Sequence, residues 1–112
     1  NFYNKLLDTV GLKKIYSDEG CVGYGQKTGP EVVEFYITMP ANGEPATYGN
    51  GTQISFLSNT RAEVDKFHAT GIENGGVCEG LPGLRPEGAS TYYSYVRDLN
   101  GNKVCAYTDS KD

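Results

Sequence analysis

The carboxylate best placed for acid–base chemistry is Glu34, which lies in an alternating run two residues before Tyr36. Side chains two residues apart in a strand point to the same face. A glutamate facing a cavity lined by tyrosines would lose contact with water, and that desolvation would make it a stronger base. The opposite register is an equal alternative, in which Val33, Phe35 and Ile37 face the interior and Glu34 stays in water. Glu34 is the candidate catalytic residue, and its face is left open.

Tyrosine is the most unusual component of the sequence, with nine tyrosines and no tryptophan. Four of them gather near the C-terminus: Tyr92, Tyr93, Tyr95 and Tyr107. A tyrosine combines an apolar ring with a hydroxyl group, so such a cluster can line a small-molecule pocket. The alternative is that these are ordinary half-buried strand residues, because strands favour aromatic side chains. Arg85 and Arg97 could hold an anionic ligand by paired hydrogen bonds, or lie at the surface as most arginines do.

The other reactive side chains match no familiar catalytic or metal motif. His68 is the single histidine and falls inside a predicted helix, which gives no support to a serine or cysteine triad of the usual kind. The three cysteines, Cys21, Cys78 and Cys105, form no Cys-x-x-Cys pair. Their odd number and wide spacing favour a reducing, cytoplasmic setting.

Composition excludes several classes of protein. The net charge is −4, and the basic residues are scattered, which argues against a nucleic-acid partner. There is no long apolar run and no basic-then-apolar leader, so neither a membrane span nor a signal peptide is predicted. At 112 residues the chain forms at most one domain, large enough to bury a core without disulfides.

The second half of the sequence has clear local signals. A helix is predicted over residues 60–74, where Thr60 and Glu63 form a capping box. A strand is predicted just upstream over residues 51–57, from its alternation. Two further alternating runs flank an Asn-Gly turn at residues 100–101, which predicts a β-hairpin. This half therefore reads as strand, helix and about three strands.

The first half has a similar order. Apolar residues recur at helical spacing over residues 2–10, and Gly11 ends the run. Candidate strands follow over residues 12–17, 21–25 and 32–39.

We predict a single domain over residues 1–112: module one spans 1–40, a linker spans 41–50, and module two spans 51–112. The helix of module two follows a strand, whereas only Asn1 precedes the helix of module one. The repeat thus predicts that the natural protein extends upstream by roughly a dozen residues, enough for one strand and a loop.

Three segments carry a resemblance to a known family: Gly49 to Phe56, Arg61 to His68, and Arg97 to Lys103. With the element order above, the chain resembles the glyoxalase/bleomycin-resistance/dioxygenase superfamily, also called vicinal oxygen chelate proteins, over nearly its whole length. Residues 80–86 and the following Tyr92-Tyr93 resemble a glyoxalase-like bacterial branch. The resemblance implies an α+β fold of two βαβββ modules, whose curled mixed sheets surround a cavity. The first strand of module one is missing from the chain.

The resemblance also implies where a metal would bind. In that superfamily a divalent metal takes ligands from several strands, and one position falls on Gln53. Another ligand would come from the missing strand. Tyr36 and Cys105 stand where a carboxylate is expected, and amide, phenol and thiol form an incoherent set for one metal. We expect no cofactor; a divalent metal held by Gln53 and the missing strand is the alternative.

We therefore expect a cytoplasmic homodimer that binds a small organic molecule without a metal, and that has neither nucleic acid nor a membrane as partner. The resemblance and the tyrosine cluster assign the cavity to Tyr36, Gln53, Tyr92, Tyr93 and Cys105. One alternative is a metal-dependent enzyme, resembling lactoylglutathione lyase or a dioxygenase, with Glu34 as base or ligand. A second alternative is a structural subunit whose cavity is filled by its own tyrosines.

Overall fold

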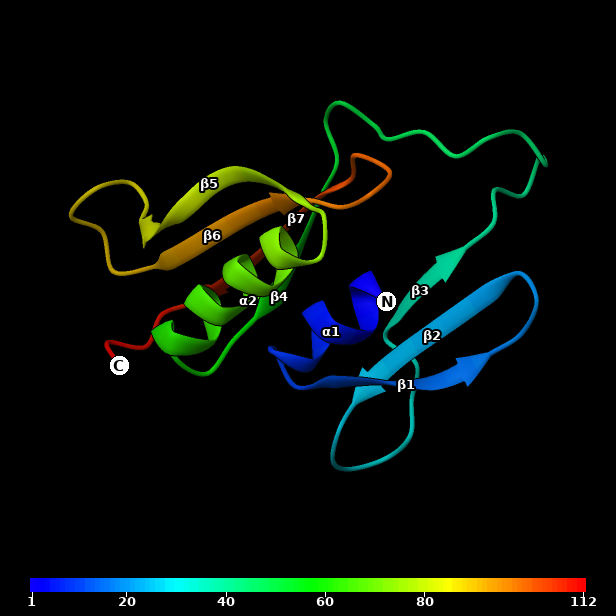
Figure 1. Ribbon diagram of the computed structural model, residues 1–112. Helices are drawn as coiled ribbons and strands as arrows, with labels where there is room; N and C mark the ends of the chain where they lie inside the picture. The colour runs from blue at the N-terminus through cyan, green and yellow to red at the C-terminus, as the bar shows by residue number, and fades with distance from the viewer.

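The computed structural model describes residues 1–112 and contains two helices and seven strands, arranged in two sheets (Figure 1). The elements are α1 (Phe2–Asp8), β1 (Leu12–Ser17), β2 (Cys21–Gln26), β3 (Phe35–Thr38), β4 (Gln53–Leu57), α2 (Arg61–Glu73), β5 (Val77–Leu84), β6 (Tyr92–Arg97) and β7 (Lys103–Thr108). The first sheet has the order β1-β2-β3, and the second has the order β4-β7-β6-β5. In Figure 1 the two sheets lie apart, with α1 between them. The predicted α+β class is confirmed, and the sheets do not close on each other.

Helix α2 forms where its capping signal predicts it. The Thr60 side chain accepts a hydrogen bond from the Glu63 backbone N–H at 3.1 Å, and the Glu63 carboxylate accepts from the Asn59 backbone N–H at 2.9 Å. These contacts satisfy backbone donors that a helix start leaves free. One stripe of the helix, including Val64 and Phe67, is fully buried against the second sheet.

The hairpin of β6 and β7 also forms as predicted, with Arg97 opposite Lys103. The Asp98 carboxylate accepts hydrogen bonds from the backbone N–H groups of Asn100 and Asn102, at 2.9 and 2.8 Å. Gly101 closes the turn with a φ of 90°, a left-handed conformation that glycine adopts without strain. Strand β7 then pairs antiparallel with β6 and parallel with β4, which makes it a central strand.

The first sheet differs from its prediction at one strand. Residues 32–39 were expected to be extended, yet β3 covers only Phe35–Thr38. The preceding segment crosses over β2 at Gly25: a Cβ at that glycine would lie 2.3 Å from the carbonyl oxygen of Val32. The segment can come this close because Gly25 has no side chain, and it leaves the regular ladder to do so.

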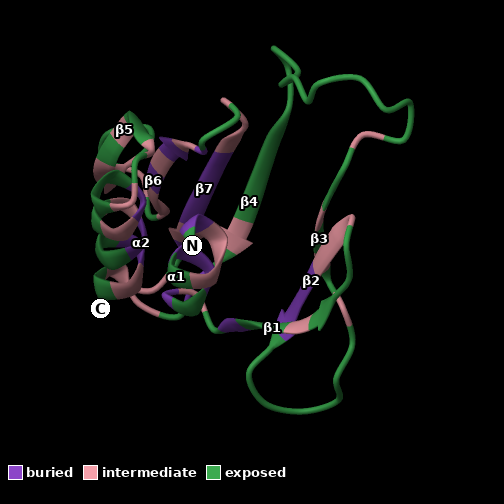
Figure 2. Ribbon diagram, turned by 45° about the vertical axis from the view of Figure 1, so that its right-hand side comes forward, coloured by how far each residue is buried: buried purple, intermediate pink, exposed green.

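The core joins both halves of the chain. Its main cluster combines α1 and α2 with the second sheet: Phe2, Leu6, Val64, Phe67, Val96, Val104 and Ala106. A smaller cluster, Leu7, Leu12 and Tyr24, lies under the first sheet. Figure 2 shows burial concentrated in β7 and part of β2, while the long linker is exposed. No helix is long and apolar enough to cross a bilayer.

Candidate functional site

The second sheet has two chemically different faces. Alternation along β6 and β7 turns Val96, Val104 and Ala106 toward the helices. The residues between them point to the other side, as do alternate residues of β4. We call this second side the tyrosine face; its central residues are Gln53, Ser55, Tyr93, Tyr95, Cys105 and Tyr107.

Three side chains form a polar group where β4 and β7 run side by side: Gln53, Ser55 and Cys105. The Gln53 amide nitrogen donates to the Ser55 hydroxyl at 3.0 Å and lies 3.7 Å from the Cys105 sulfur. The Cys105 thiol in turn donates to the Ser55 hydroxyl at 3.2 Å. Burial raises the pKa of Cys105, with the Ser55 hydrogen bond as a smaller opposing effect, so the thiol keeps its proton at neutral pH. Gln53 and Cys105, both predicted site residues, are thus brought together, and Ser55 joins them.

The tyrosines of this face form a stack. The rings of Tyr93 and Tyr95 are 5.8 Å apart and nearly parallel, and Tyr107 stacks on Tyr93 at 5.9 Å. Burial raises the pKa of Tyr95. The sequence prediction named Tyr93 but left out Tyr95 and Tyr107. Their shared alternation across the hairpin was the signal that could have placed them on one face.

Cations surround the stack. The Lys103 ammonium group lies 5.0 Å from the centre of the Tyr95 ring, and the Arg85 guanidinium lies 5.3 Å from it. Arg97 pairs with Glu79 at 3.1 Å, and this hydrogen bond lowers the pKa of Glu79. Lys103 and Arg85 form no ion pair, although Lys103 also helps to lower the pKa of Glu79 and the Arg85 guanidinium donates to the Leu81 carbonyl at 2.7 Å. The face therefore presents aromatic surface together with unpaired positive charge.

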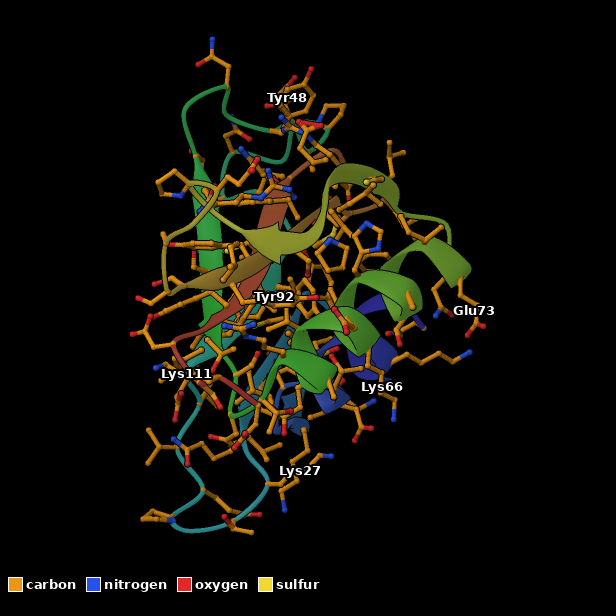
Figure 3. The ribbon with its side chains drawn as sticks, turned by 90° about the vertical axis from the view of Figure 1, so that its left-hand side faces the viewer. Lys27, Tyr48, Lys66, Glu73, Tyr92 and Lys111 are labelled. Atoms are coloured by element: carbon orange, nitrogen blue, oxygen red, sulfur yellow. The ribbon has the colours of Figure 1, made fainter.

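Two predicted cavity residues lie elsewhere. Tyr92 is on the helix side of β6, where its hydroxyl donates to Asp65 of α2 at 2.6 Å (Figure 3). Adjacent strand residues point to opposite faces, so Tyr92 and Tyr93 do not line one surface. Tyr36 is 55% exposed and belongs to β3 in the other sheet. It lines a hollow of about 390 Å³ between β3 and β4, whose wall includes Phe2 and Ile54.

Glu34, the candidate base, is exposed and precedes β3. Phe35 and Ile37 pack against the smaller core cluster, as the alternative register expected. Glu34 lines a second hollow of about 550 Å³, which also includes Ser55 and Leu57 of β4. The structure brings it near one end of the polar group and away from the tyrosine stack.

The side chains of the tyrosine face do not fit a metal of the kind the superfamily implies. No group of three or more histidine, cysteine, aspartate or glutamate side chains is gathered anywhere in residues 1–112. The donors nearest to Gln53 are a hydroxyl and a protonated thiol. Hard divalent ions prefer carboxylate oxygens, and soft ions prefer thiolates and imidazoles, so this neutral set suits neither.

Comparisons with known proteins give a consistent picture. No model of a protein family matches the sequence, and no curated protein matches it. A crystal structure of a glyoxalase/bleomycin resistance protein from Albidiferax ferrireducens T118 is 40% identical, with a TM-score of 0.80, covering 96% of this chain and 83% of that one. A glyoxalase-related enzyme from Fulvimarina pelagi has the same fold at 17% identity, with a TM-score of 0.69 over 96% of this chain and 75% of that one. A family enzyme from Burkholderia phytofirmans PsJN, described as glyoxalase/bleomycin resistance protein/dioxygenase, is 15% identical, with a TM-score of 0.68 over 97% and 86%.

Proposed function

This chain belongs to the glyoxalase/bleomycin resistance/dioxygenase superfamily, and we propose that it binds a small organic molecule on its tyrosine face without a metal. The single observation that carries the proposal is the stack of Tyr93, Tyr95 and Tyr107, flanked by the unpaired cations of Lys103 and Arg85. The three rings are half-buried, and aromatic side chains beside a few polar groups are the usual ingredients of a small-molecule site.

The charges favour one class of ligand. A planar molecule would lie against the tyrosine rings, as aromatic groups do in offset stacks. A carboxylate on that molecule would reach Lys103 or Arg85, neither of which forms an ion pair with an acidic side chain. The Gln53 and Ser55 side chains offer further hydrogen-bonding groups at the edge of the stack. We propose an aromatic or conjugated carboxylate as the ligand.

The donor chemistry supports binding without a metal. The Cys105 thiol stays protonated and the nearest partners are neutral, so the ligand would be held by stacking and charge rather than by coordination. Homodimerisation and a cytoplasmic location remain predictions; the unpaired edge of β3 is a surface that a second copy could cover.

The test uses benzoate as the probe, with benzamide as its neutral counterpart, and follows backbone amide NMR shifts of the protein in the presence of EDTA. We expect shifts confined to the second sheet and Arg85, with benzoate binding more tightly than benzamide. Lys103→Gln should weaken benzoate binding about fivefold, because an exposed charge pair contributes about 1 kcal/mol. Lys111→Gln, at the far C-terminal end, is the matched control and should leave binding unchanged (Figure 3).

Two outcomes would overturn the proposal. Shifts that fall in the hollow between β3 and β4 would move the site away from the tyrosine face. Binding that appears only after Mn²⁺ or Zn²⁺ is added would replace metal-free binding with the metal-dependent alternative.

A further inference from the structure

A cysteine and a histidine meet on the outer surface of the second half, away from the tyrosine face. The Nε2 atom of His68, in α2, lies 3.1 Å from the sulfur of Cys78, in β5. This separation is within hydrogen-bonding range for a thiol and an imidazole. The two residues come from different elements, so the contact depends on how α2 packs on the sheet.

The protonation state of the pair suits proton transfer from sulfur to nitrogen. Burial lowers the pKa of His68, and the nearby Asp65 carboxylate opposes this only in part. The imidazole is therefore neutral at pH 7, and its free nitrogen can accept the thiol proton. The Asp65 carboxylate is itself held by the Tyr92 hydroxyl at 2.6 Å.

Access and rigidity also favour chemistry at this sulfur. Cys78 is exposed, so a reactant can reach it, whereas His68 is partly buried behind it. His68 follows the fully buried Phe67 on α2, and Cys78 pairs with the fully buried Val96 in the sheet. The backbone on each side of the contact is thus anchored by a neighbouring core residue.

The other two cysteines lack this arrangement. Cys105 is fully buried, and its partners are the neutral Ser55 and Gln53 side chains. Cys21, in β2, is half-buried and makes no side-chain hydrogen bond. Only Cys78 combines an exposed sulfur with a base in contact.

We propose that Cys78 and His68 form a nucleophilic site that captures α,β-unsaturated carbonyl compounds by covalent addition. The thiol proton passes to Nε2 of His68 while the sulfur electron pair forms a bond to the β-carbon of the compound. The C=C electron pair moves toward the carbonyl oxygen, giving an enolate. The enolate α-carbon then takes the proton back from the imidazolium, which restores neutral His68. The product is a thioether, with no leaving group and no change of oxidation state that needs a further reagent.

This site is independent of the proposed ligand-binding function. Cys78 faces the helix side of the second sheet, whereas its neighbour Glu79 points to the other side, where it pairs with Arg97. Loss of binding at the tyrosine face would leave the reaction at Cys78 untouched.

The experiment measures the rate at which acrylamide adds to each cysteine of the folded protein at pH 7. Trypsin cuts after lysine and arginine, so each of the three cysteines falls on its own peptide, and mass spectrometry reports each rate separately. We expect His68→Gln to slow addition at Cys78 about tenfold, the lower end of what a general base contributes. The rate at Cys21 in the same sample should stay the same.

The matched control is Ala69→Gln, which places a glutamine at the next, exposed position of α2. It should leave the Cys78 rate unchanged. In urea all cysteines of the wild type and of His68→Gln should react at similar rates, because the pair exists only in the folded chain. A Cys78 rate that drops less than twofold in folded His68→Gln would overturn the proposal. His68→Asn serves as a second variant if the glutamine alters the melting curve, and an unchanged rate there would overturn it equally.

Discussion

The two halves of the chain follow the same order of helix and antiparallel strands, yet they contribute unequally. The second sheet has four strands, and its central strand β7 is paired on both sides. The first sheet has three strands and a core cluster of three buried residues, against seven in the main cluster. Helix α1 belongs to the first half, but its Phe2 and Leu6 are buried in the main cluster. A repeat in sequence therefore need not divide stability evenly.

The candidate binding and reactive side chains are also distributed unequally between the two halves. The polar group, the tyrosine stack and the Cys78–His68 pair all belong to the second half. The first half contacts the second half through an aromatic pair, in which the ring centres of Phe35 and Phe56 are 5.1 Å apart. The tyrosine stack and Cys105 lie on β6 and β7, which are paired on both sides and so hold these side chains at fixed spacing.

The largest effect should come from the main cluster. Phe67→Ala removes a fully buried ring, and we expect a loss of about 3–5 kcal/mol in unfolding free energy. Leu12→Ala in the smaller cluster should cost about 2 kcal/mol, because that residue lies at the edge of its core. Denaturant unfolding measures both values. Equal losses would contradict the unequal division of stability.

The next effect concerns the glycine at the strand crossing. Gly25→Ala would bring a methyl group to within 2.3 Å of the Val32 carbonyl oxygen, so the segment before β3 must move. We expect a loss of about 1–3 kcal/mol, typical of overpacking. Gly83→Ala is the control in the second sheet, since nothing lies within 4 Å of its added methyl group. Thermal melting should separate the two variants, and an unchanged melting temperature for Gly25→Ala would refute the close crossing.

The smallest effect is a pH dependence at the tyrosine face. The Arg97 hydrogen bond lowers the pKa of Glu79 in the folded chain. The pair therefore stabilises the fold fully at pH values above the pKa of an unfolded glutamate, which is about 4. This contribution is lost as the pH falls through the lowered pKa. The melting temperature of the wild type should thus exceed that of Glu79→Gln at pH 7. The difference should vanish once the pH is below the lowered pKa of Glu79. A difference that is constant with pH would mean that the charge on Glu79 contributes nothing.

Local signals in the sequence determined most of the fold. The capping box at Thr60, the Asn-Gly turn before Gly101 and the alternation over residues 53–57 each depend on neighbours a few residues away. Such interactions form in the same way wherever the segment lies. The family resemblance, which was drawn from these segments, is confirmed at 40% identity.

The site depended on more than local signals. Tyr92 and Tyr93 were predicted to line one cavity; alternation puts them on opposite faces, but the sequence could not say which face meets a helix. The structure decided this by packing α2 on the side of Tyr92, where Asp65 holds its hydroxyl. The predicted cavity, in contrast, missed a signal that the sequence did contain, because alternation alone places Tyr95 and Tyr107, rather than Tyr92, on the face of Tyr93.

The sequence by itself determined the elements and their order, because these follow from short-range backbone and side-chain preferences, and the resemblance of three segments identified the family. Only the tertiary structure decided that Cys105 meets Ser55, 50 residues away, and that Cys78 meets His68 across a helix and a strand. Such contacts depend on how a helix is seated on a sheet. That seating is set by the whole buried core, and no single segment encodes it.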